Sequence, residues 1–254
     1  MDWITQVKTV PALQPFLWLS RLFSLVVPIV QVQAMPTFQP FLALLAGDAS
    51  LDVVGEMSLS LLETPCFDQA VKALQQDPAC AALIAARHMA PAHDLAALLE
   101  CPPDSLGYLY ASHMQARGFR AEELYESLPI TSDASYVEAR LSQTHDIWHI
   151  VTGFGVTEAD EIGLQAFHLP QFPYPLAVTL LSSSMMSTLM LSPKDLPMLL
   201  EAIRRGWEMG QLAKPFFAQK WEDAWDKPLA QWRQELNVRT VGSGHGSAMP
   251  LPNN

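Results

Sequence analysis

The chain of 254 residues is long enough for one large domain or two small ones. Its 15 basic and 26 acidic residues give a formal net charge of −11, which argues against nucleic acid as a partner because phosphate backbones bind to basic surfaces. Half of the residues are hydrophobic and the mean hydropathy is +0.13. This apolar surplus has to be buried in a large core, in a homodimer interface, against a membrane or around an apolar ligand.

The N-terminal segment, residues 1–35, is predicted to be an apolar segment that packs on the rest of the domain or on a membrane. Residues 22–47 include no charged side chain, but Pro28, Pro36 and Pro40 interrupt this stretch. A helix that spans a membrane needs about 20 mainly apolar residues in succession, and the pieces here are shorter. We therefore expect burial or peripheral membrane contact rather than a membrane span.

Residues 36–238 show helical periodicity almost throughout, whereas strand-like alternation is scarce. Asp77 and Pro78 are typical of an N-cap and a first helical residue, and Gly118 is placed to end another helix. These signals predict a single all-α, multi-helix domain. The polar, Gly- and Pro-rich residues 239–254 are predicted to form a disordered tail.

Residues 162–193 contain no Asp, Glu, Lys or Arg. Within them, residues 176–191 are predicted to form a helix that is apolar on all sides, which is typical of a central buried helix. The small Ser and Thr residues and the flexible Met residues of this helix also suit a wall around a long apolar ligand, or a close contact between subunits. If the helix lines a lipid-binding groove, the expected contacts are Leu180, Met185, Met186 and Leu189.

A helix predicted over residues 135–153 carries two histidines and a carboxylate within five residues. It is predicted to start at a capping-box pair, Ser135 and Glu138. On this helix, His145 and His149 lie about 40° apart, and Asp146 lies about 60° from His149. Two imidazoles at positions i and i+4 are a common way to hold a divalent metal, because one helical turn separates the donor atoms suitably.

A second helix is predicted to bring a further carboxylate to these histidines. Gly153 ends the first helix, and Thr157 with Asp160 forms another capping-box spacing directly before the second. If the two helices fold back on each other, Glu161 returns to the level of His149. Two imidazoles and one or two carboxylates then converge on a site suited to zinc and compatible with iron, manganese or magnesium.

Other interpretations of the histidine pair stay open at this point. The two histidines can be incidental members of a polar helix face, and an H-E-x-x-H zincin needs a Glu where Asp146 stands. A phosphohydrolase of the His…His-Asp…Asp type would recruit His113, although no final Asp stands out. The three cysteines form no C-x-x-C pair, which argues against a zinc–thiolate site. His168 is expected to be an ordinary core or surface histidine.

The stretch "HDIWHIVTGFGVTEADE" resembles the H-D-x-x-H-(eleven residues)-E signature of the coenzyme Q biosynthesis protein 4 family. Two flanking stretches agree with it. "DSLGYLYASHMQARGF" is similar to the family's small-residue Leu-Gly-Tyr segment, and "GWEMGQLAKPFFAQKWEDAWDKPLAQWRQELNV" is similar to its C-terminal segment. The resemblance runs from Pro36 to Val238, and three separate matches occur in the family's order.

This resemblance implies that the metal ligands are His145, Asp146, His149 and Glu161. It also implies a mainly helical protein, peripheral at a membrane, that binds a prenylated quinone precursor or another isoprenoid lipid and associates with other quinone-biosynthesis enzymes. The prenyl tail would occupy an apolar tunnel or groove in the domain. We expect a bacterial member of the family in the cytoplasm, at the inner face of a membrane, because neither a secretory nor a mitochondrial leader is evident.

Two functions follow from the resemblance. In the first, the protein is a metal-dependent enzyme that removes the carboxyl group from ring carbon 1 of a prenylated hydroxybenzoate. In the second, it is a non-catalytic lipid-binding scaffold that organises the other enzymes. The residues alone do not separate these functions, because a set of metal ligands does not reveal turnover.

Overall fold

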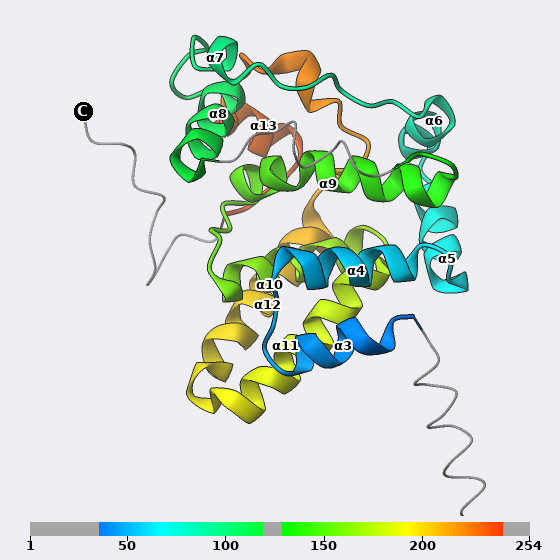
Figure 1. Cartoon of the computed structure of the whole chain (residues 1–254). Coiled ribbons are helices and arrows are strands. Elements are labelled where there is room, and N and C mark those ends of the chain that lie inside the picture. The colour runs from blue at the N-terminus through cyan, green and yellow to red at the C-terminus, as the bar shows by residue number, and fades with distance from the viewer. Residues whose placement is uncertain (1–35, 119–128, 241–254) are drawn as a thin grey trace, which may run out of the picture.

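The computed structural model describes residues 36–118 and 129–240 (Figure 1). The described residues are helical and contain no strand, so the prediction of a single all-α domain is confirmed. The predicted segment 1–35 lies outside the described residues, as do residues 241–254 of the predicted tail. The helices are α3 (Phe38–Leu45), α4 (Leu51–Leu61), α5 (Pro65–Leu74), α6 (Pro78–Ala86), α7 (Leu95–Leu98), α8 (Leu106–Arg117), α9 (Asp133–Thr152), α10 (Glu158–Gln171), α11 (Pro175–Leu191), α12 (Leu196–Leu212) and α13 (Leu229–Glu235), with 3₁₀ helices at Pro193–Asp195 and Trp221–Ala224.

Helix α9 lies across the middle of the molecule, with α7, α8 and α13 on one side and α4, α10 and α12 on the other (Figure 1). Most of its residues are buried. Gly153 ends it in a left-handed conformation with φ of +79°, as predicted. The predicted start at Ser135 is wrong: Ser132 is the N-cap, and it exchanges hydrogen bonds with Ser135. This earlier cap leaves Glu138 inside the helix, where its carboxyl group is buried.

Two other predicted helix ends are present in the structure. Asp77 accepts hydrogen bonds from the backbone N–H groups of Ala79 and Cys80, ahead of Pro78 at the start of α6. Gly118 follows α8 with φ of +67°. These signals were predictable because a cap depends on residues within one turn of the helix end.

Helices α10 and α12 pack unusually closely through glycines. A Cβ atom on Gly206 would lie 1.9 Å from the carbonyl oxygen of Gly163, and one on Gly210 would lie 2.4 Å from that of Phe167. Helical residues advance by about 100° each, so Gly163 lies on the face of α10 opposite to Glu161. The contact with α12 therefore leaves the Glu161 face of α10 available to α9.

Helix α11 is not the central buried helix that its composition predicted. It lies beside α3 at the edge of the molecule (Figure 1). One side packs inward through residues such as Leu180, Leu181, Ser183 and Ser187, which are at least nine-tenths buried. The other side faces outward with side chains that are 42% to 70% exposed, namely Val178, Met185, Met186, Leu189, Met190 and Leu191. We call these six residues the α11 apolar surface.

Candidate metal centre

Two histidines of α9 face each other one helical turn apart. The Nε2 atoms of His145 and His149 are 3.1 Å apart, and the two rings are nearly perpendicular. His149 is buried, and its Nδ1 lies 3.3 Å from the carbonyl oxygen of Phe154. An Nδ1–H that donates to this oxygen leaves the Nε2 lone pair free to bind a cation. The side chain of His145 is 35% exposed, so the pair opens to solvent on that side.

Helix α10 brings Glu161 to both imidazoles. Thr157 caps this helix by accepting a hydrogen bond from the Asp160 N–H, as its spacing predicted. Glu161 follows this cap by four residues, and its Oε2 lies 3.2 Å from Nε2 of His149 and 3.4 Å from Nε2 of His145. The structure therefore brings together three of the four predicted ligands from two helices.

The three ligand atoms fit a single divalent ion. The distances between them run from 3.1 to 3.4 Å. Ligand atoms around a four-coordinate zinc, with bonds of about 2.0–2.2 Å, are separated by about 3.3–3.6 Å. Two imidazoles and one carboxylate with an open side also match the donor set of catalytic zinc sites. Without a cation or a proton between them, the lone pairs of the carboxylate and the His149 Nε2 would repel each other.

The electrostatics of the cluster favour a cation. Burial acts to raise the pKa of the Glu161 carboxyl group, but hydrogen bonds and charge from His145 and His149 hold that pKa well below its usual value. Burial acts to lower the pKa of His145, and the carboxylates of Glu161, Asp146 and Glu138 raise it above the ordinary value. The field at the cluster therefore attracts positive charge, whether a proton or a metal ion.

A family model described as "Coenzyme Q (ubiquinone) biosynthesis protein Coq4" matches residues 35–242. The match covers most of the chain, including α9, α10 and the three converging side chains. The chain belongs to this family. The resemblance found in the sequence is thus confirmed, and the matching family is one named for ubiquinone biosynthesis.

Individual relatives agree with the family match. The mitochondrial ubiquinone biosynthesis protein COQ4 of Uncinocarpus reesii is 26% identical over 145 residues, which are 56% of this chain and 50% of that protein. The Aedes aegypti homologue is 24% identical over 148 residues, 57% of this chain and 53% of its own. This chain therefore spans about half the length of these curated relatives.

A solved structure is also similar to this chain. The crystal structure of a Nostoc punctiforme protein named for ubiquinone biosynthesis superposes with a TM-score of 0.73 at 33% identity. The aligned region covers 82% of this chain and 98% of the Nostoc chain. The helical fold described above is thus shared with this Nostoc protein.

The fourth ligand that the family signature implies, Asp146, is not among the three converging atoms. Its Oδ1 lies 3.9 Å from Nε2 of His113, on the side of α9 that faces α8. The pairing of His113 with Asp146 links two residues that the sequence had connected only through the phosphohydrolase alternative. Asp146 as a metal ligand stays a prediction.

A buried carboxyl group beneath the centre was missed in the sequence. Glu138 precedes His145 by two helical turns on the same face of α9, and it accepts hydrogen bonds from the hydroxyl groups of Ser58 and Tyr174. Burial raises the pKa of Glu138 above its usual value. The spacing of seven residues from His145 is the signal that would have placed Glu138 on the ligand face.

His168 is a core residue, as expected. Its ring stacks on Trp148 with centroids 4.6 Å apart, and its Nδ1–H donates to the carbonyl oxygen of Leu164. Burial lowers the pKa of His168 to about 3, so the imidazole is neutral at physiological pH. Its ring contacts are with Trp148, Phe172 and Tyr174, and it is not one of the three converging ligand residues.

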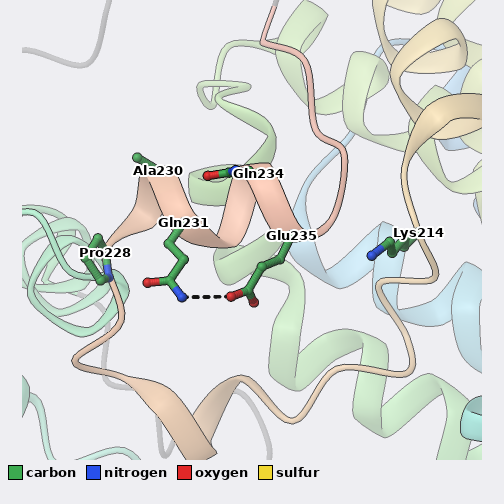
Figure 2. Close-up of a pocket in the computed structure, with 6 residues that line it drawn as sticks. All are labelled: Lys214, Pro228, Ala230, Gln231, Gln234 and Glu235. Carbon is green, nitrogen blue, oxygen red and sulfur yellow. Dashed lines mark hydrogen bonds between the residues drawn. The ribbon is translucent and has the colours of Figure 1, made fainter.

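The predicted lipid contacts divide between the interior and the surface. Leu180 is buried, whereas Met185, Met186 and Leu189 belong to the α11 apolar surface. A separate hollow lies beside α13 (Figure 2), and none of the predicted metal or lipid contacts lines it. Its lining is mainly polar: Lys214, Pro228, Ala230, Gln231, Gln234 and Glu235. Within the described residues, no helix combines the length and apolar character that crossing a bilayer requires.

Proposed function

We propose that this protein is a metal-dependent enzyme of ubiquinone biosynthesis that removes the ring carbon-1 carboxyl group of a prenylated hydroxybenzoate. The observation that carries the proposal is the convergence of His145, His149 and Glu161, in a chain of the Coq4 family. Family membership supplies the pathway, and the three side chains supply a site at which chemistry on a carboxylate is reasonable. Substrate and reaction are both part of the proposal.

The metal would be held by His145, His149 and Glu161, with zinc best suited to that donor set and iron, manganese or magnesium compatible with it. A bound divalent ion supplies a Lewis acid that polarises a carboxylate or phenolate oxygen. The Phe154 carbonyl fixes the ring of His149, which preorganises the site. The half-exposed sides of His145 and Glu161 leave room for a carboxylate to approach.

The proposed decarboxylation needs no oxidant. The bond between ring carbon 1 and the carboxyl carbon breaks, carbon dioxide leaves, and the electron pair of that bond stays on the ring carbon. A proton then takes the place of the carboxyl group. Because His145 and Glu161 border solvent, this proton can come from water that reaches the site.

The α11 apolar surface supports contact with the prenyl tail or with a membrane. Six apolar side chains on one helix, with no charged residue among them, form the kind of patch that soluble monomers rarely leave uncovered. Peripheral membrane contact, homodimer formation and docking of other quinone-biosynthesis enzymes are proposed for the same surface.

That surface also favours the second candidate function, a lipid-binding scaffold without turnover. Met198 and Leu200 of α12, which are 60% and 45% exposed, add to the apolar area near α11. A scaffold needs such surface more than it needs an open metal site. In this alternative the metal ion stabilises the α9–α10 junction, and the exposed side chains bind lipid and partner enzymes.

The test is turnover of a prenylated hydroxybenzoate by the purified protein and by Glu161→Ala. The enzyme is supported if the variant loses product formation by at least about 100-fold while partner enzymes still co-purify with it. The scaffold function is supported instead if the wild-type protein shows no turnover and partner enzymes no longer co-purify with Glu161→Ala. Full turnover by Glu161→Ala would remove the metal centre from the reaction altogether.

A further inference from the structure

The loop between α9 and α10 carries the atom that orients His149. Phe154 lies in this loop, and its carbonyl oxygen is 3.3 Å from Nδ1 of His149. The opposite ring nitrogen, Nε2, faces Glu161. A metal-bound imidazole is held in its orientation when its other N–H donates to such an oxygen. The position of the Phe154 carbonyl therefore affects how well His149 can bind a metal ion.

The side chain of Phe154 is anchored on α10. It is 2% exposed, and its ring lies so close to Gly163 that a Cβ atom added there would be 2.5 Å from the ring carbon Cε1. A larger residue at position 163 would have to displace the ring. Because the ring and the carbonyl belong to the same residue, a contact that holds the ring also holds the carbonyl beside His149.

Arg205 of α12 reaches the same ring. Its guanidinium carbon lies 5.2 Å from the centroid of Phe154, within the range of a cation–π contact. The Nε atom of Arg205 is buried and has no hydrogen-bond partner among the described residues. The neighbouring Arg204 differs, because it forms exposed ion pairs with Glu201 and Glu208. Arg205 therefore places its charge on an aromatic ring, whereas Arg204 places its charge on carboxylates.

The glycine contact between α10 and α12 brings Arg205 to this ring. Gly206 directly follows Arg205 and packs on the carbonyl oxygen of Gly163, the residue that also lies against Phe154. Close packing of the two helices thus puts the start of the Arg205 side chain near the ring. The α9–α10 loop, α10 and α12 all meet at Phe154.

We propose that Arg205 is a positioning residue for the metal centre. Its guanidinium holds the ring of Phe154 against α10, and this keeps the Phe154 carbonyl in place to accept the Nδ1–H of His149. In this role Arg205 contacts Phe154 and affects the ion only through His149. The inference rests on the metal centre of the proposed function and deepens it.

The first test measures zinc affinity by competition with a chelator. Arg205→Met keeps a long unbranched side chain and removes its charge. We expect the zinc dissociation constant to rise about fivefold, because a single contact is lost at one remove from the ion. Arg205→Lys keeps a positive charge and should retain part of the affinity. Arg204→Met, the control on the adjacent residue, loses only exposed ion pairs and should bind zinc as the wild type does.

The second test asks whether Arg205 acts through the ring. Phe154→Leu removes the ring but keeps the backbone carbonyl, and we expect its zinc dissociation constant to rise about tenfold. Adding Arg205→Met to Phe154→Leu should change the affinity by less than about 1.5-fold, because the ring that the arginine contacts is already gone.

A third measurement observes the hydrogen bond itself. Proton NMR of the zinc-loaded protein follows the exchange of the His149 Nδ1–H with water. Arg205→Met should speed this exchange, because the proton is held less firmly by the Phe154 carbonyl, and Arg204→Met should not. A loss of general stability would not single out this proton.

The outcomes separate the inference from the proposed function. If Arg205→Met binds zinc as tightly as the wild type, or weakens binding equally with and without the Phe154 ring, the inference is overturned while the proposed function stands. The same holds if Arg204→Met has an equal effect, or if the exchange of the His149 proton does not change in Arg205→Met. If the wild type binds no zinc, the metal-dependent function fails and the inference fails with it.

Discussion

The side chains at the α9–α10 junction and those on the outer side of α11 have opposite surroundings. At the junction, His149 is 2% exposed and its ring nitrogens face Phe154 and the other ligand atoms. On α11, Met190 is 70% exposed and meets no comparable partner among the described residues. The junction is therefore defined by contacts within the chain, whereas the function of the α11 apolar surface depends on what covers it.

The largest expected effect is at the junction. His149→Ala removes the most buried of the three ligand side chains, so we expect metal content to fall from about one ion per chain to almost none. Mass spectrometry of the purified proteins measures this directly and names the ion. His93→Ala, another buried histidine outside the cluster, is the matched control and should keep its metal.

An absence of metal in the wild type would contradict the metal centre. The α9–α10 junction would then be a polar helix contact held by protons, and the scaffold function would be favoured over the enzyme. A metal-loaded His149→Ala protein would mean that other residues hold the ion. In that case Asp146, the remaining residue of the family signature, would be the first candidate to examine.

The next largest effect is on the packing that holds α10 in place. Gly206→Ala would put a Cβ atom 1.9 Å from the Gly163 carbonyl oxygen, so α10 and α12 have to separate. We expect a loss of about 3 kcal/mol or more in the free energy of unfolding, measured by denaturant titration. Gly55→Ala, in the middle of α4 with no atom near the added methyl group, should instead gain about 0.5–1 kcal/mol. Equal effects from the two variants would contradict the close contact.

Much of the junction could be predicted because its signals are local. The spacing of His145 and His149, the cap at Thr157 and the stop at Gly153 all depend on residues within a few turns. The start of α9 was misplaced because Ser132 offers a better cap than Ser135, and the two signals overlap in sequence.

The contacts between distant parts of the chain could not be predicted. His113 meets Asp146 across 33 positions, and Gly206 meets Gly163 across 43. No spacing rule connects such residues before the helices are packed. The outward side of α11 was missed for another reason: a helix that is apolar on every side shows no amphipathic pattern, so its sequence does not indicate which face is covered.

A smaller effect tests how far the buried environment extends beneath the metal centre. Burial raises the pKa of Glu138 above the ordinary 4.5, so the folded protein keeps this proton to a higher pH than the unfolded chain does. The resulting stabilisation is complete below pH 4.5 and is lost as pH rises through the pKa of the folded state. Glu138→Gln carries no charge, so it should become progressively more stable than the wild type as pH rises.

We expect the melting temperatures of Glu138→Gln and the wild type to be similar near pH 5. At pH 8 the variant should melt a few degrees higher, which corresponds to about 1 kcal/mol in the free energy of unfolding. Thermal unfolding across this range measures the difference. Glu100→Gln, on an exposed residue after α7, is the control and should show no such trend. A difference between Glu138→Gln and the wild type that stays constant with pH would mean that the carboxyl group is ionised at no cost in the fold.

The smallest effect on stability is expected on α11. Met190→Ser removes an apolar side chain that is 70% exposed, so the free energy of unfolding should change by less than about 0.5 kcal/mol. The metal content should not change. Binding to neutral lipid vesicles, measured by co-sedimentation, should nevertheless weaken, because the side chain contributes apolar area to that contact. Ala177→Ser, on the buried side of the same helix, gives the reverse pattern: lower stability with vesicle binding unchanged while the protein is folded. If Met190→Ser destabilises the protein instead, the Met190 side chain is packed against another part of the same chain. The outer side of α11 would then be held by contacts within the chain, as the α9–α10 junction is.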